Sequence, residues 1–191
     1  MLEKINELDR QLFFYFNNLG NFTWDPFWLL VTEKWTAIPL YALLLYLIFR
    51  KFKLKGAIIT AILIALLITV TDQLGNIFKD HFMRLRPCGQ EGVMEYARFV
   101  AKRCGRYGYF SAHASNSMGV AVFLGIILKK YYHYLIYFLL GWSLLVSYSR
   151  VYLGVHYPGD ILTGMFIGAL FGYLFSLLHN YLMRRFRVPA G

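Results

Sequence analysis

Three clusters in this 191-residue chain combine basic residues with histidine, serine or aspartate at fixed spacing. In chain order they are Lys79, six residues and Arg86-Pro87; Ser111-Ala112-His113; and Ser149-Arg150, five residues, His156, three residues and Asp160. A phosphoryl group in transfer spreads negative charge over its equatorial oxygens, and fixed guanidinium and ammonium groups stabilise that charge. Lys79, Arg86 and Arg150 are therefore candidate phosphate ligands.

The two histidines of these clusters supply the remaining chemistry. Imidazole can act as a nitrogen nucleophile or as an acid near neutral pH. His156 is the better candidate nucleophile, because Asp160 follows four residues later and could hold the ring in one tautomer. His113 is then the acid that protonates the leaving oxygen and later activates water. The pattern indicates phosphoryl transfer through a phosphohistidine.

Ser111 and Ala112 precede a long apolar stretch. If they open a helix, the Ser111 hydroxyl and the backbone N–H groups around Ala112 can donate to an anion. The ordinary interpretation of a basic residue at a membrane boundary is contact with lipid headgroups. We apply that interpretation to the other basic residues of the same region, Arg84, Arg98, Lys102, Arg103 and Arg106.

The elements that carry these clusters are predicted to be membrane helices. Apolar and aromatic residues make up 58% of the chain and charged residues only 16%, with a net charge of +10, whereas a soluble domain is about 25% charged. Residues 107–128, 131–149 and 161–183 contain no Asp, Glu, Lys or Arg, and each can cross the bilayer. Pro26–Phe49 and Gly56–Phe78 are less clean candidates. We expect one all-α membrane domain over residues 1–191 with about five transmembrane helices.

The first residues have a different pattern. Over residues 2–19, Leu2, Ile5, Leu12, Phe13 and Phe16 recur at helical spacing, and Glu3, Lys4, Glu7, Asp9 and Arg10 occupy the other side. This favours an amphipathic helix lying in the membrane interface. A sixth span from Leu12 to Thr32 is less favoured, because it would bury four polar residues. The start lacks the features of a cleavable signal, so we expect it to be retained.

Five spans place the three clusters on one face of the membrane. Nine Lys and Arg residues then fall on the opposite face and eleven on the cluster face, so raw counting does not orient the chain. If several of the eleven bind an anion, the nine mark the cytoplasmic side and the clusters are extracytoplasmic. Cys88 and Cys104 lie on the cluster face, where an oxidising compartment would permit a disulfide. Two free thiols remain the alternative, because sequence gives no Cα distance.

Small and polar residues inside the spans suggest helix contacts. Gly164, Gly168 and Gly172 form a stripe that lets another helix approach closely. Packing within the chain is the default interpretation, and a homodimer seam is the alternative. Asn116 could hydrogen-bond across helices, and Asp72 could support Lys79.

The clusters resemble the three-part signature of the type 2 phosphatidic acid phosphatase (PAP2) superfamily of membrane lipid phosphatases. The first and third parts match without a gap, and the second has Phe110 for Pro and Ala112 for Gly. The resemblance implies that His156, oriented by Asp160, is the nucleophile and that His113 is the general acid. The phosphate-binding residues that it implies are Lys79, Arg86, Ser111, Ala112 and Arg150. It also implies no metal and no other cofactor.

The resemblance further suggests a bacterial enzyme of the inner (cytoplasmic) membrane with an extracytoplasmic site. The expected partners are a lipid phosphate substrate and membrane lipids, with no nucleic acid. Undecaprenyl diphosphate is the favoured substrate, and phosphatidylglycerophosphate and the 1-phosphate of lipid A are the alternatives. A protein that binds or transports a phospholipid headgroup without cleaving it would explain the cations but not the pairing of His156 with Asp160.

Overall fold

The computed structural model of the chain describes residues 2–188, without the side chains of Leu2 and Lys34. The expected domain also includes residues 1 and 189–191, which lie outside the described residues. The described part contains helices and no strand, which confirms the all-α prediction. The elements are α1 (Leu2–Asn18), α2 (Asp25–Thr32), the 3₁₀ turn η1 (Lys34–Ala37), α3 (Ile38–Phe82), the 3₁₀ turn η2 (Pro87–Gly89), α4 (Ala112–Ile127), α5 (Leu135–Tyr152) and α6 (Pro158–Arg185).

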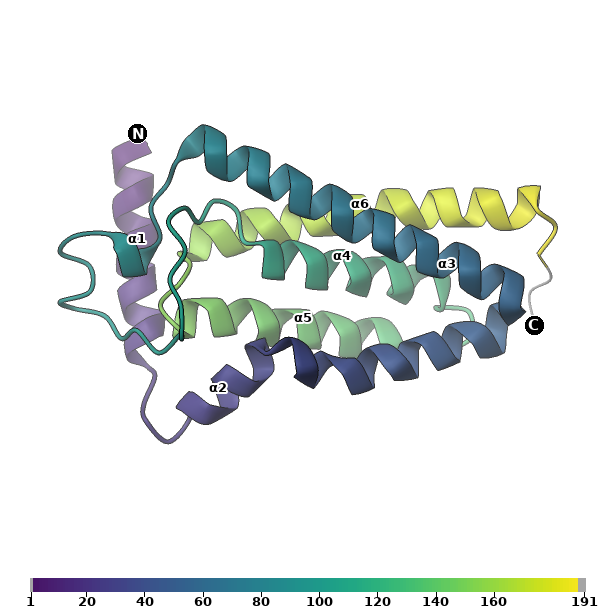
Figure 1. Cartoon of the computed structure of the whole chain (residues 1–191), viewed down its shortest axis with the longest axis horizontal. Coiled ribbons are helices and arrows are strands. Elements are labelled where there is room, and N and C mark those ends of the chain that lie inside the picture. Colours follow the sequence, from purple (N-terminus) through teal and green to yellow (C-terminus); the bar gives the residue numbers. More distant parts are fainter. Residues whose placement is uncertain (1, 189–191) are drawn as a thin grey trace.

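Helix α3 is two helical arms joined at a sharp turn. Lys53 has the non-helical backbone angles φ 53° and ψ −171°, and the chain reverses direction there. The second arm runs back toward the end of the bundle where α1 lies (Figure 1). The two arms and helices α4, α5 and α6 thus correspond to the five predicted spans.

The boundaries of two predicted spans were wrong. Pro26–Phe49 is not one helix, because the chain is extended at Glu33 and α2, η1 and the first arm of α3 follow one another. The stretch 107–128 is helical only from Ala112, since Tyr107 to Ser111 form the connection into α4. By length and composition, three helical stretches can cross a membrane in the described part: Trp35–Phe82, Leu135–Tyr152 and Pro158–Arg185. Helix α4 is apolar but shorter.

Helix α4 forms the centre of the bundle, and most of its residues are buried. The glycines of α6 allow this packing: a Cβ built at position 168 would lie 2.2 Å from the Ser115 carbonyl oxygen, and one at 172 would lie 2.5 Å from that of Gly119. The glycine stripe therefore faces α4, as the default interpretation predicted. Outer faces of the bundle expose large apolar side chains such as Leu43, Ile62 and Phe166, as expected of a surface solvated by lipid.

Helix α1 crosses one end of the bundle (Figure 1). Asp9, Phe13 and Asn17 lie four residues apart and are all buried. The Asn17 amide donates to the carbonyls of Val151 and Tyr152 at 3.1 and 2.9 Å, which fixes α1 to the end of α5. The prediction that Asp9 lies on the solvated side of this helix was therefore wrong.

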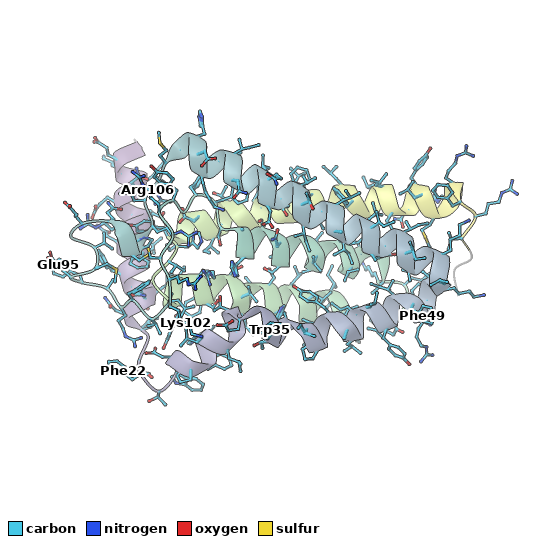
Figure 2. The ribbon with its side chains drawn as sticks, in the orientation of Figure 1. Phe22, Trp35, Phe49, Glu95, Lys102 and Arg106 are labelled. Carbon is cyan, nitrogen blue, oxygen red and sulfur yellow. A yellow bond between two sulfur atoms is a disulfide. The ribbon has the colours of Figure 1, made fainter. Side chains whose placement is uncertain are left out.

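The two ends of the bundle differ. The long loop between α3 and α4 lies with α1 at one end, where Figure 2 shows Lys102 and Arg106. Phe49 lies toward the opposite end, near the turn of α3. That far end also receives the basic residues of the turn and the end of α6, among them Lys51, Lys55 and Arg185.

Candidate active site

His156, in the connection between α5 and α6, forms a buried pair with Asp160 in the first turn of α6. Gly154, at φ 78°, turns the chain, and a Cβ there would lie 2.6 Å from the Arg98 carbonyl oxygen. His156 Nδ1 lies 3.3 Å from Asp160 Oδ2, which also accepts a 3.0 Å bond from the Tyr157 backbone N–H. The two residues are 2% and 0% exposed. Because the carboxylate occupies Nδ1, the nitrogen left for chemistry is Nε2.

Arg86 is held beside this pair by a short antiparallel contact. Its backbone N–H donates to the Arg106 carbonyl at 3.2 Å, and its Nε donates to the Tyr107 carbonyl at 2.9 Å. Its terminal nitrogens have no hydrogen bond within residues 2–188, which leaves them for an anion.

Gly108 separates Arg86 from the histidine. A Cβ at this position would lie 3.0 Å from Arg86 Cγ, 3.1 Å from Asp160 Oδ2 and 3.5 Å from His156 Nδ1. A larger residue would push these groups apart. Sequence reasoning missed this glycine, and its only signal was its place shortly before Ser111.

The disulfide between Cys88 and Cys104 closes the loop next to this contact, with a Cα–Cα distance of 6.1 Å. Leu85 and Tyr107, which flank that loop in the sequence, form an isolated antiparallel bridge. The sequence left this pairing open.

Arg150 lies in the last turn of α5 and is partly buried. Its Nη1 donates to the hydroxyl of Thr32, and its Nε is buried with no partner among the described residues.

Lys79 extends from the second arm of α3, where its Nζ lies 3.5 Å from Asn76 Oδ1 and within electrostatic range of Arg86. Asn116 donates to Asp72 at 2.8 Å, which is the predicted contact across helices. Asp72 also acts electrostatically on Lys79.

The start of α4 meets the start of α6 at this end. Ser111 is the N-cap of α4, and its N–H donates to the Asp160 carbonyl at 3.1 Å. Its hydroxyl is buried without a partner in residues 2–188. Ala112 has a helical backbone, which does not require glycine, and His113 follows in the same turn. The structure thus gathers the predicted site residues at one end of the bundle.

The structure corrects the interpretation of Arg84 as a headgroup contact. Its Nη1 donates to Asp160 Oδ1 at 2.7 Å and its Nη2 to Asp9 Oδ2 at 2.5 Å. Arg98 likewise pairs with Asp25 at 2.7 Å, and Lys102 lies 3.3 Å from Glu33. Ion pairs between segments distant in the chain leave no local pattern, so sequence reasoning missed both Asp9 and the role of Arg84.

Burial dominates the electrostatics of the site. It lowers the pKa of His156 to about 4, and the charges of Arg86 and Arg150 act in the same direction, whereas the hydrogen bond and the charge of Asp160 oppose them. Burial also lowers the pKa of Arg86, against the charge of Asp160. His156 is therefore neutral at pH 7, the state that a nucleophile needs.

Comparisons with known proteins give this arrangement a family. Residues 55–184 match the model of the PAP2 superfamily. The chain is 37% identical over 188 residues to a lipid A 4'-phosphatase of Bacteroides thetaiotaomicron, covering 97% of this chain and 83% of that protein. It is 32% identical to a lipid A 4'-phosphatase of Porphyromonas gingivalis, over 96% of this chain and 78% of that protein.

Two more distant relatives carry other names. A phosphatidylglycerophosphatase B of Bacillus subtilis is 32% identical over 65% of this chain and 61% of its own length. An undecaprenyl-diphosphatase of Sulfolobus acidocaldarius is 32% identical over 74% of this chain and 63% of its own length.

A solved structure shares the fold. The crystal structure of a transmembrane PAP2-type phosphatidylglycerolphosphate phosphatase from Bacillus subtilis superposes with a TM-score of 0.73 and 18% identity, over 93% of this chain and 87% of that one. Family model, relatives and fold agree, and the chain belongs to the PAP2 superfamily as a membrane lipid phosphatase.

Proposed function

We propose that this enzyme removes a phosphate monoester from a lipid A-type glycolipid, at the position corresponding to the 4'-phosphate. The support for this substrate is the similarity, over nearly the whole chain, to two lipid A 4'-phosphatases. The undecaprenyl diphosphate expected from the sequence keeps only the support of a shorter match. It is the second candidate.

The observation that carries the chemistry is the buried His156–Asp160 pair surrounded by cations and unpaired donors. Arg150 Nε and Ser111 Oγ are buried and unpartnered among the described residues, and a buried donor left unpaired costs about 1–3 kcal/mol. A phosphoryl group bound against them would remove that cost. Lys79 and Arg86 add charge for its other oxygens.

The reaction that follows has two steps. Nε2 of His156 attacks phosphorus while Asp160 holds Nδ1–H and stabilises the developing imidazolium. The bond from phosphorus to the sugar oxygen breaks, and His113 protonates that oxygen. Water activated by His113 then attacks the phosphohistidine, which releases inorganic phosphate and restores His156. No step in this scheme uses a metal or a cofactor.

We also propose that the site faces the extracytoplasmic side of a bacterial inner membrane, with residues 1–191 acting as one domain. The disulfide lies at the site end, and a disulfide persists in oxidising compartments. The basic residues at the opposite end then follow the positive-inside rule.

The test is phosphate release by purified enzyme in detergent micelles. Lipid A, undecaprenyl diphosphate and phosphatidylglycerophosphate are offered at equal mole fraction, and mass spectrometry locates the phosphate removed from lipid A. We expect fastest turnover of lipid A with loss of its 4'-phosphate, loss of activity in His156→Ala, inhibition by vanadate, and no inhibition by EDTA. Faster turnover of undecaprenyl diphosphate would replace the proposed substrate, and full activity of His156→Ala would refute the mechanism.

A further inference from the structure

We propose that Asp9 and Arg84 are positioning residues of this phosphatase, which act through Asp160 to hold His156 in its reactive orientation. The inference rests on the proposed function, because it assigns a role within the same site. It also gives α1 a part in the reaction, although α1 contains none of the residues of the three clusters.

The guanidinium of Arg84 is fixed between two carboxylates. Nη1 and Nη2 donate to Asp160 and to Asp9 at 2.7 and 2.5 Å, and the cation lies 4.5 Å from the ring centroid of Tyr157. The side chain of Arg84 is 24% exposed, whereas those of Asp9 and Asp160 are 10% and 0% exposed. Arg84 cannot turn toward a substrate without leaving two buried carboxylates unpaired, which is costly. Its geometry therefore fits a positioning role and not phosphate binding.

The carboxylate of Asp160 is held from three directions. Arg84 occupies Oδ1, and the Tyr157 N–H and His156 Nδ1 share Oδ2. The backbone contact fixes one oxygen and Arg84 fixes the other, so the carboxylate cannot rotate about its terminal bond. The tilt of the His156 ring, and with it the direction of Nε2, depends on that carboxylate.

Asp9 also fixes the turn of α6 that carries Asp160. Its Oδ1 accepts a 2.7 Å bond from the Gly159 N–H, and a Cβ at position 159 would lie 2.7 Å from its Oδ2. Pro158 has no N–H to offer, so Gly159 carries the first free donor of the helix. A carboxylate at a helix N-terminus is favourable. Asp9 thus holds both the guanidinium and the backbone next to Asp160.

Four variants of the full chain test the role. Asp9→Asn keeps an acceptor for Gly159 but removes the charge facing Arg84. Arg84→Gln removes the positive charge and the paired N–H donors of the guanidinium, and Arg84→Lys restores the charge alone. Asp25→Asn is the matched control, because its 2.7 Å ion pair with Arg98 has similar exposure, 15% and 21%, and does not touch His156 or Asp160.

The measurements are kcat and KM for lipid phosphate, the acid limb of kcat/KM, and the thermal unfolding midpoint. We expect kcat to fall about 10- to 100-fold in Asp9→Asn and Arg84→Gln. This is the range measured when a partner that orients a metal-bound histidine is removed, which is a comparable loss of orientation. KM should change little, and Arg84→Lys should recover part of kcat. Asp25→Asn should lower the midpoint without changing kcat.

The pH profile separates orientation from general destabilisation. The charged groups that act on His156 are Asp160 from α6, Arg150 from α5 and Arg86 from the loop. Arg84→Gln removes a cation bound to Asp160. Loss of this positive charge favours the imidazolium form of His156, so the acid limb should move to higher pH. Arg84→Lys should keep the wild-type limb.

Two results would overturn the proposal. In the first, Asp9→Asn and Arg84→Gln keep wild-type kcat and acid limb and lose only thermal stability, as Asp25→Asn does. In the second, both Arg84 variants raise KM and keep kcat, which would make Arg84 a direct phosphate ligand.

A measurement without substrate distinguishes this proposal from the proposed function. The NMR signal of ¹³C-labelled His156, assigned by its absence in His156→Ala, can be titrated in micelles. If wild-type protein releases no phosphate from any lipid, the proposed function fails, but His156 should still titrate at higher pH in Arg84→Gln than in wild type. An unchanged titration would reject the positioning role by itself.

Discussion

Acidification to about pH 5 should leave most of the enzyme in its reactive protonation state. Burial, aided by the charges of Arg86 and Arg150, lowers the pKa of His156 to about 4. At pH 5 such a group is about 90% neutral, whereas a histidine with the ordinary pKa of about 6.5 would be only about 3% neutral. The difference amounts to roughly 30-fold in the population able to attack phosphorus.

The same shift has a consequence for stability. Between about pH 6.5 and pH 4 the unfolded chain binds a proton at His156 that the folded chain does not, so acid favours unfolding. Stability that is fully present above about pH 6.5 is lost as the pH falls through 4. The loss reaches about 3 kcal/mol, since each pKa unit corresponds to about 1.4 kcal/mol. The opposing contribution of Asp160 is already included in that pKa.

The assay is kcat/KM between about pH 3.5 and pH 8, because this ratio reports the free enzyme. A phosphate monoester itself titrates near pH 6, so two substrates with different phosphate pKa values are needed. A limb that moves with the substrate belongs to the substrate, and the fixed limb belongs to the enzyme. A fixed limb centred near pH 6.5 would refute the reasoning, because it would mean that His156 is neither desolvated nor surrounded by positive charge.

Two further predictions concern the supports of the site. The double variant Cys88→Ser, Cys104→Ser should lose about 3 kcal/mol of unfolding free energy, the chain-entropy value for a separation of 16 residues. Reductant should lower the unfolding midpoint of wild type and leave that of the variant unchanged. Equal midpoints of wild type and variant without reductant would contradict this prediction. Gly168→Ala should lower the midpoint strongly, because its Cβ would lie 2.2 Å from the Ser115 carbonyl oxygen. Gly141→Ala is its control, since in residues 2–188 nothing beyond the adjacent residues and the backbone of its own helix lies within 4 Å of the added Cβ. A midpoint at or slightly above wild type is expected there.

The helices and the clusters could be predicted because both leave local patterns. Charge-free stretches located the spans. The spacing of Arg150, His156 and Asp160 predicted that these residues lie where α5 ends and α6 begins. The boundaries were less accurate, because hydropathy does not distinguish the apolar connection from Tyr107 to Ser111 from the helix that follows it.

The residues that hold the His156–Asp160 pair in place could not be predicted from local patterns. Arg84 meets Asp9 across 75 residues, and only the folded chain brings them together. Asp9 has a weak signal, since it lies four residues before Phe13 and eight before Asn17 and so shares their buried face. The charges around it favoured the opposite interpretation. Gly108 looks like any loop glycine until the side chains on both sides of it are placed.

The bond between Asp9 and Gly159 joins residues 150 positions apart. A ribosome that feeds the chain into the bilayer delivers Asp9 well before the turn that contains Asp160. Until α6 has inserted, Arg84 lacks one of its two carboxylate partners and His156 lacks its contact with Asp160. Nascent chains that have not inserted α6 should therefore be inert toward lipid phosphates, so hydrolysis should begin only after this helix is in place.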